Sequence, residues 1–427
     1  MNNIKIDDHF STNPSYPYEL NKDLPGLKDI INWVGKSKHV KSFLILHNNK
    51  LIVEKYFNGT TKDDKSDVFS VSKSVTSLLI GIALQKKLIR LNDPISKYTR
   101  VNEHWSNTTF ENEKRITISH MLNMTCGLND EMKYVTDPGK RWHYNLGSAW
   151  HMLKEVVQNV SRTPLQTIAD QWLFSKLNIT PIFKPRQGTG KFFDLIKAYV
   201  QNYYKDIFYN NGLSPINIGV SLLYMLVKKY NRLLRFITSY LSMFTLLTIY
   251  EGYTTYRKYS DARKYFLKPT TSLHCSGMDC IRLGQLILNN GINIDTKEQI
   301  IDREYINSCK HATTQDLNPS YSNMFWLNGK GKHINPTSIF STIDPEVIYE
   351  DLIPSAPSDL ICFMGYNTQR IYVCPSLNIV VVRQGDEESE GATAAKSEFD
   401  EQLWNALMAL FNKMNKNLQR QQMLTKL

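Results

Sequence analysis

The stretch that decides the fold is residues 67–80, DVFSVSKSVTSLLI. Ser70 stands three residues before Lys73, and an apolar run follows at once. Residues at i and i+3 share a helix face, so the hydroxyl and the amine come within hydrogen-bond reach. Burying a lysine without a partner costs several kcal/mol or lowers its pKa until it loses the proton. The spacing therefore predicts either a helix-capping serine beside a lysine that reaches solvent, or a serine nucleophile beside a buried base.

The second alternative would give the serine a specific chemical task. At the start of a helix, free backbone N–H groups and the positive end of the dipole favour a developing oxyanion. A desolvated Lys73 could accept the proton of Ser70 and so prepare it for acyl transfer. The spacing alone leaves both alternatives open.

Composition indicates a globular chain, and acyl transfer on Ser70 would need no cofactor. The chain has 427 residues, which is enough for one large or two ordinary domains. Hydrophobic residues make up 42% of it, which is enough for a substantial core. Its six cysteines show no CxxC pair, and no His-Glu-x-x-His motif or carboxylate cluster indicates a metal. The first residues, MNNIKIDDHF, lack the profile of a secretory signal, so we expect an intracellular protein.

The positive charge of the chain is concentrated in one segment. The net charge is +11, and residues 184–268 hold fourteen Lys/Arg against four Asp/Glu. No recognisable nucleic-acid-binding module accompanies them. We therefore expect no nucleic-acid partner.

Strand patterns occur near both ends of the chain. Residues 42–57 predict a β-hairpin that turns at Asn48 and Asn49, and residues 370–385 predict a second hairpin. Residues 394–418 have helical spacing. These patterns predict an α+β fold in which both chain ends build one antiparallel sheet and the middle forms a mostly helical lobe.

Several blocks, in order, resemble the serine β-lactamase and penicillin-binding-protein superfamily, most closely its class C-like branch of esterases, D-aminopeptidases and 6-aminohexanoate-dimer hydrolases. The blocks include FSVSKSVTSLLIGIAL, LNDPISKY, RITISHMLNMTCGL, DPGKRWHYN, LHCSGMDCIRLGQLILNNG and FMGYNTQRIYVCPSLNIVVVRQG. The resemblance implies a β-lactamase/transpeptidase-like fold. Residues 1–69 and 271–427 would form its α/β lobe, and residues 70–270 its helical lobe.

The resemblance also implies roles for individual residues. Ser70 would be the nucleophile, and Tyr144 in WHYNLG would match the tyrosine that takes part in proton transfer. The hydroxyl of a tyrosine ordinarily has a pKa of ~10. Lys73 would stabilise the phenolate of Tyr144 and so make it a better base. Asn145 would contact the substrate from the variable middle position of the motif. Leu146 replaces the asparagine of the family, which argues against β-lactam recognition.

The third motif of the family would lie at the turn before the second hairpin. Tyr366 would replace the usual Lys or His, Asn367 would follow it in the substrate-contacting turn, and Thr368 would sit where a glycine lets substrate approach. Gln369 would offer the second oxyanion N–H, beside that of Ser70. Without the basic group, either the substrate lacks a carboxylate or the activity is weak.

An insertion at about 184–268 separates this chain from its relatives, which run almost directly from the position of Pro181 to that of Thr271. Its two uncharged runs, residues 213–227 and 236–250, reach about 22 Å each, short of the ~30 Å needed to span a bilayer. One alternative is a peripheral membrane contact through residues 213–250. The other is a helical pair that forms a lid or a dimer surface.

Two functions follow from these patterns. The first is a serine hydrolase that cleaves an amide or ester bond of a small-molecule or peptide substrate through an acyl-enzyme on Ser70. The alternative is an inactive binding or scaffold protein of the same fold, associated with a membrane or with itself through the insertion. The oligomeric state is left open.

Overall fold

The computed structural model describes residues 20, 23–99, 110–129, 134–145, 148–185, 271–312, 316–335, 347–386 and 397–424. Met1–Lys184 and Ser272–Leu427 form one compact unit, and Pro185–Thr271 form a second. The predicted insertion lies outside the described residues from position 186 to its end. The lobe boundaries expected at residues 70 and 271 stay predictions.

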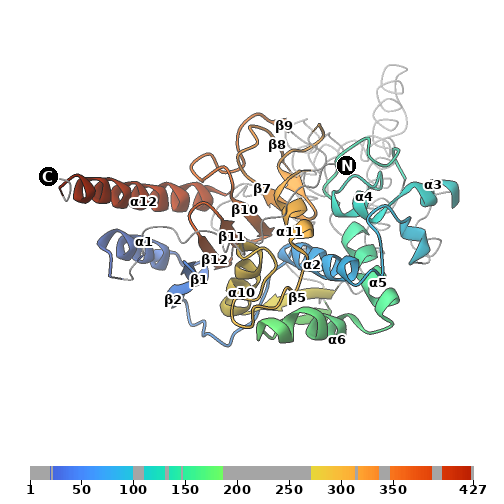
Figure 1. Ribbon diagram of the computed structural model, residues 1–427, viewed down its shortest axis with the longest axis horizontal. Coiled ribbons are helices and arrows are strands. Elements are labelled where there is room, and N and C mark those ends of the chain that lie inside the picture. The colour runs from blue at the N-terminus through green and yellow to red at the C-terminus, as the bar shows by residue number, and fades with distance from the viewer. Residues whose placement is uncertain are drawn as a thin grey trace, which may run out of the picture. The chain divides into compact units, whose positions relative to one another are not determined.

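Strands from both ends of the chain form one seven-stranded antiparallel sheet in the order β2-β1-β12-β11-β10-β7-β6, which confirms the predicted α+β architecture (Figure 1). Its strands are β1 (Val40–His47), β2 (Lys50–Tyr56), β6 (Tyr321–Ser322), β7 (Phe325–Leu327), β10 (Ile361–Gly365), β11 (Gln369–Cys374) and β12 (Ile379–Gly385). The first hairpin turns at Asn48 and Asn49 as predicted, with φ of 49° and 61°. A two-residue hairpin turn of this kind needs positive φ at both positions, which asparagine tolerates.

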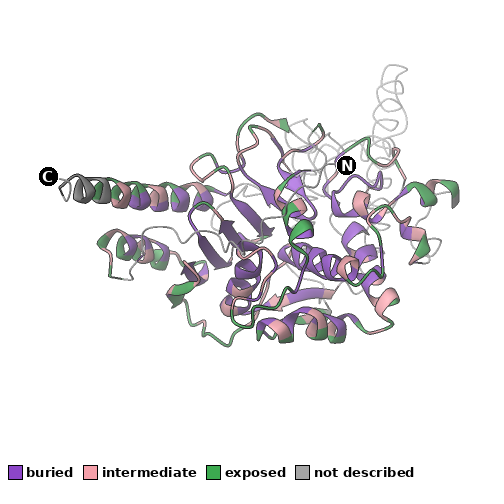
Figure 2. Ribbon diagram, viewed as in Figure 1, coloured by how far each residue is buried: buried purple, intermediate pink, exposed green. Residues whose placement is uncertain are grey.

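Helices cover both faces of this sheet. One face packs against α10 (Gly277–Leu288), where Gly284 lies in contact with side chains of β11 and β12. The other face packs against α1 (Pro25–Lys36) and α12 (Glu398–Leu424), whose Trp33 and Phe399 stack with ring centroids 5.1 Å apart. The three strands β10, β11 and β12 are buried throughout because both faces are covered (Figure 2).

A buried helix, α2 (Val71–Gln85), follows the sequence stretch that contains Ser70. Its residues 71–83 are all buried, which a helix achieves only when it is packed on every side. It contacts α5 (Ser148–Ser161) and β10. It therefore connects the helical part to the sheet.

Shorter elements complete the described chain. They are β3 (Ser66–Asp67), η1 (Ile95–Lys97), α3 (Phe110–Arg115), α4 (Ile118–Leu122), α6 (Leu165–Ala169), η3 (Asp170–Phe174), η4 (Ser175–Leu177), β4 (Ile182–Pro185), β5 (Thr271–Cys275), α11 (Arg303–Lys310), β8 (His333–Ile334) and β9 (Val347–Ile348). Strands β3, β5 and β4 form a small sheet, and β8 pairs with β9.

Candidate active site

Ser70 sits at the N-terminus of α2, directly after a strained residue. Phe69 has a φ of +48°, a region that bulky side chains rarely adopt, and its N–H donates a hydrogen bond to Asp67 Oδ1 (2.7 Å). Ser70 itself is helical, with φ −70° and ψ −10°. The sharp turn before it brings the chain into α2 at the serine. Strain of this kind is often found at functional sites.

Lys73 is buried and bound to the serine. Lys73 is only 3% exposed, and its Nζ donates a hydrogen bond to Ser70 Oγ (3.0 Å). The same Nζ lies 5.0 Å from the ring centroid of Tyr144 and 5.6 Å from that of Trp150. Aromatic faces attract a cation, so these rings offset part of the cost of burying it. The predicted alternative in which the lysine reaches solvent is wrong.

Tyr144 lies beside Lys73 in a cluster of aromatic rings. It is 5% exposed, and its ring centroid lies 6.1 Å from that of Tyr321 and 5.7 Å from that of Trp326. Burial and the neighbouring Tyr144 raise the pKa of Tyr321 well above its usual value, so Tyr321 stays neutral. The structure therefore brings Ser70, Lys73 and Tyr144 together through the lysine.

Asn145 is fully buried and bound to the protein itself. Its Nδ2 donates to the carbonyl oxygen of Asn129 (2.9 Å), and its Oδ1 accepts from the N–H of Ala149 (3.3 Å). The second bond caps the first turn of α5. These two bonds use one of the two N–H donors and one of the two acceptor sites of the amide. Leu146 lies outside the described residues.

The turn between β10 and β11 approaches Ser70 closely. A Cβ placed on Gly365 would lie 3.3 Å from the backbone nitrogen of Ser70 and inside contact distance of the Val68 carbonyl oxygen. Tyr366 is 40% exposed, and its ring lies edge-to-face against Phe69 with centroids 5.5 Å apart. The predicted substrate-contacting turn thus lies against the residues that hold the nucleophile.

The rest of this turn is strained, with Asn367 half-buried and Thr368 buried. Asn367 and Thr368 have φ of 58° and 55°, and Thr368 is 4% exposed. The N–H of Gln369 donates a long hydrogen bond to the carbonyl oxygen of Tyr366 (3.4 Å). The side chain of Gln369 reaches away from the turn to the backbone of Gly385.

Two arginines that the sequence analysis did not single out hold this turn. Arg370 and Arg383 are at most 1% exposed, and both donate to carbonyl oxygens of residues 365–369. A signal for them existed in the sequence, because each arginine stands at the end of an apolar strand pattern. Charged side chains in such positions are rarely buried without a partner.

Other candidate groups have structural roles. His120 accepts a hydrogen bond from the N–H of Thr117 (3.2 Å) and completes the N-terminal capping box of α4. All six cysteines are buried and none forms a disulfide. Among the residues that the structure describes, no group of three or more His, Cys, Asp or Glu side chains could hold a metal ion.

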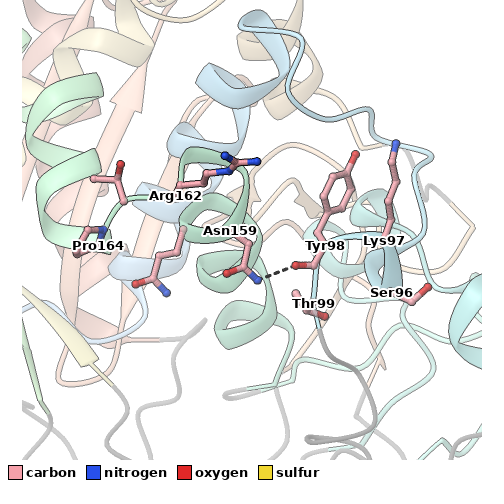
Figure 3. A pocket seen from close by; sticks show the side chains of 9 residues that line it. Ser96, Lys97, Tyr98, Thr99, Asn159, Arg162 and Pro164 are labelled. Atoms are coloured by element: carbon pink, nitrogen blue, oxygen red, sulfur yellow. Dashed lines mark hydrogen bonds between the residues drawn. The ribbon is translucent and has the colours of Figure 1, made fainter.

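A polar cavity of about 820 Å³ opens elsewhere, between η1 and the end of α5 (Figure 3). Residues that line it include Lys97, Tyr98, Asn159 and Arg162, and Asn159 Nδ2 donates to the carbonyl oxygen of Tyr98 (2.7 Å). It contains none of the predicted site residues. The chemistry at Ser70 therefore does not extend to this cavity.

Comparison with known proteins gives a family match for part of the chain and similar folds among solved structures. Residues 38–183 match the family model described as β-lactamase. An uncharacterized protein of Alkalihalophilus pseudofirmus is 29% identical over 142 residues, which are 30% of this chain and span 40% of that curated relative. A predicted β-lactamase of Bacteroides dorei has a TM-score of 0.57 at 14% identity, covering 91% of this chain and 99% of its own. A predicted 6-aminohexanoate-dimer hydrolase of Bacillus anthracis has a TM-score of 0.53 at 15% identity, covering 91% and 82%.

Identities this low between structures show the fold alone. They confirm the resemblance and the fold class expected from the sequence, since both structures cover nine tenths of this chain. The chain therefore has the fold of the serine β-lactamase and penicillin-binding-protein superfamily, and its residues 38–183 match the β-lactamase family.

Proposed function

We propose that this protein is a serine hydrolase that cleaves an amide or ester bond through an acyl-enzyme on Ser70. The observation that carries the proposal is the 3.0 Å hydrogen bond between Lys73 and Ser70 at the start of α2, with the lysine 3% exposed. Burial favours the neutral form of an amine, and a neutral amine can take the proton of a neighbouring hydroxyl. A lysine kept only for stability would gain more from reaching solvent.

The proposed reaction uses the residues in a fixed order. Ser70 Oγ attacks the carbonyl carbon while its proton passes to Lys73, directly or through Tyr144. The oxyanion is held by the N–H groups of Ser70 and Gln369. The leaving amine or alcohol takes the proton, and water then hydrolyses the ester on Ser70 with the same groups acting in reverse.

We further propose a substrate whose acyl part carries no carboxylate. By the resemblance, Tyr366 would replace the basic side chain of the family, and Arg370 and Arg383 donate to backbone carbonyls of this turn. The aromatic pair of Phe69 and Tyr366 beside Ser70 suits an uncharged acyl group.

A fluorophosphonate probe tests the proposal, because it phosphonylates an activated serine and leaves an ordinary one unmodified. We expect labelling of the full chain and none of Ser70→Ala. A fluorescent penicillin, run in parallel, should label weakly or not at all. Absence of Ser70-dependent labelling by the fluorophosphonate would instead favour the inactive binding or scaffold protein.

Membrane contact through residues 213–250 is a separate proposal, because these residues lie outside the described chain. Within the described part, no helix is long and apolar enough to cross a bilayer. Liposome flotation of the full chain and of a variant without residues 186–266 tests it. Equal flotation of the two proteins would exclude that segment as the membrane-binding part.

A further inference from the structure

We infer that Arg383 is a positioning residue for the oxyanion-binding amides, acting through the carbonyl groups of the β10–β11 turn. This inference rests on the proposed acyl-enzyme chemistry at Ser70. A side chain on the face of the sheet remote from Ser70 would thereby influence the reaction through the backbone of the turn.

Arg383 holds two consecutive peptide groups of the turn. Its Nη1 donates to the carbonyl oxygens of Asn367 and Thr368, at 2.9 Å each. Its Nη2 donates to the carbonyl oxygen of Asp386 (2.8 Å). The residue is fully buried, so these bonds are shielded from water and strong.

Arg370 holds the two ends of the same turn. Its Nη1 donates to the carbonyl oxygens of Gly365 (2.9 Å) and Gln369 (3.2 Å). Its charge is balanced by Asp400 of α12, whose Oδ2 lies 3.1 Å from Nε in an ion pair that is almost fully buried. Tyr372 donates to the other oxygen of Asp400. Arg370 therefore anchors the turn to α12.

The arginines and Ser70 lie on opposite sides of the turn. Arg370 and Arg383 are paired neighbours on β11 and β12, and the guanidinium of Arg383 lies 5.1 Å from the ring centroid of Phe399 in α12. On the other side, the Cβ position of Gly365 faces the backbone nitrogen of Ser70. The turn is thus enclosed between α12 and the start of α2.

In a trans peptide the C=O and N–H bonds point in opposite directions. Because Arg383 draws the carbonyls of Asn367 and Thr368 toward α12, the N–H groups of Thr368 and Gln369 are directed to the side of Ser70. A cation bound to a carbonyl also polarises the peptide and strengthens its N–H as a donor. The N–H of Gln369 donates a long hydrogen bond to the carbonyl oxygen of Tyr366 (3.4 Å), which a developing oxyanion could displace.

The turn requires such an anchor because its backbone is strained. Asn367 and Thr368 are both left-handed, and a β-branched residue rarely adopts this conformation. Such residues persist only where the surrounding structure holds them. Without Arg383, the two peptides would be free to rotate, and their N–H groups would lose their direction.

The test compares labelling kinetics of the full chain and three variants with the fluorophosphonate probe. Arg383→Met keeps the apolar stem over Phe399 but removes every donor, and Arg383→Lys keeps the charge but not the fork of donors. Val373→Ala, on the α10 side of β11, serves as a matched control that loses packing without touching the turn.

We expect Arg383→Met to lower the maximal labelling rate constant about 10- to 100-fold, because removing one oxyanion donor outright costs about 10²- to 10³-fold. The half-saturating probe concentration should change less than about threefold. Arg383→Lys should be intermediate. Val373→Ala should melt at a lower temperature but label at the rate of the unmodified protein. Equal labelling of Arg383→Met and the unmodified protein would overturn the inference.

A second measurement does not depend on turnover. In protein labelled with ¹⁵N-glutamine, the amide proton of Gln369 should move upfield in Arg383→Met and stay in place in Val373→Ala. If the unmodified protein shows no Ser70-dependent labelling, the proposed function fails and this resonance alone decides the inference. A Gln369 resonance that does not move would then refute it.

Discussion

Gly365 offers the sharpest single perturbation of the candidate site. It lies at the end of β10, paired with Gln369 across the turn, and no side chain separates it from the residues before α2. Gly365→Ala adds one methyl group there and removes no hydrogen bond.

The size of the effect follows from the space available. The new Cβ would lie 3.1 Å from Cβ of Gln369, 3.3 Å from the Ser70 nitrogen, and well inside contact distance of the Val68 carbonyl oxygen. The two atoms before α2 are backbone atoms, so the strand itself must move by roughly 0.5–1 Å. A displacement of about 1 Å between reacting groups can cost on the order of 10²-fold in rate. Overpacking should also lower the free energy of unfolding by about 1–3 kcal/mol.

The assay is the rate of fluorophosphonate labelling, measured together with urea unfolding. Gly284→Ala is the matched control, because its Cβ would press on Val380 and Ile371 between α10 and the sheet, away from Ser70. Both variants should lose stability, and only Gly365→Ala should lose labelling. If Gly365→Ala is labelled as fast as Gly284→Ala, the turn does not contribute to the site in the way proposed.

Three further changes test other parts of the structure. Lys73→Met should abolish labelling yet raise the free energy of unfolding by about 1–3 kcal/mol, because an apolar side chain replaces a buried polar amine; a lower free energy of unfolding, measured in urea, would contradict this. Burial lowers the pKa of His120, so the unfolded chain binds its proton more readily, and stability should fall as the pH drops below about 6.5. His120→Gln should remove this slope between pH 7.5 and 5.5, and an unchanged slope would assign it to other groups. Burial lowers the pKa of Lys310 to about 8, so the stability of the unmodified protein relative to Lys310→Met should rise by about 2–3 kcal/mol between pH 8 and 10.5. A constant difference over that range would show that Lys310 is not desolvated.

Local patterns were sufficient to predict the parts of the fold that depend on neighbouring residues. The hairpin at Asn48 and Asn49 was predictable because two adjacent residues that tolerate positive φ determine the turn. The contact between Ser70 and Lys73 was predictable because i and i+3 share a helix face. Tyr144 could be placed beside them only through the resemblance, since no local rule connects residues so far apart.

The roles of other residues depend on distant partners and could not be predicted. Asn145 caps α5 and binds the carbonyl of Asn129, which requires that both segments have already folded. Arg370 and Arg383 bind carbonyl groups of the same turn only because of the register of β11 and β12 and the position of α12. Sequence shows that a buried charge needs a partner, but not which of many carbonyls it will find.

The place of β1 in the sheet has a consequence for synthesis of the protein. One edge of this apolar strand pairs with β2 immediately, but the other pairs with β12, and Ser42 meets Gln384 from 342 positions further along the chain. Until the ribosome has made that last strand, a nascent chain exposes an open, hydrophobic strand edge of the kind that recruits other chains. Prematurely terminated products should therefore aggregate. Chaperones should remain bound longest to the N-terminal part of the chain, which contains β1.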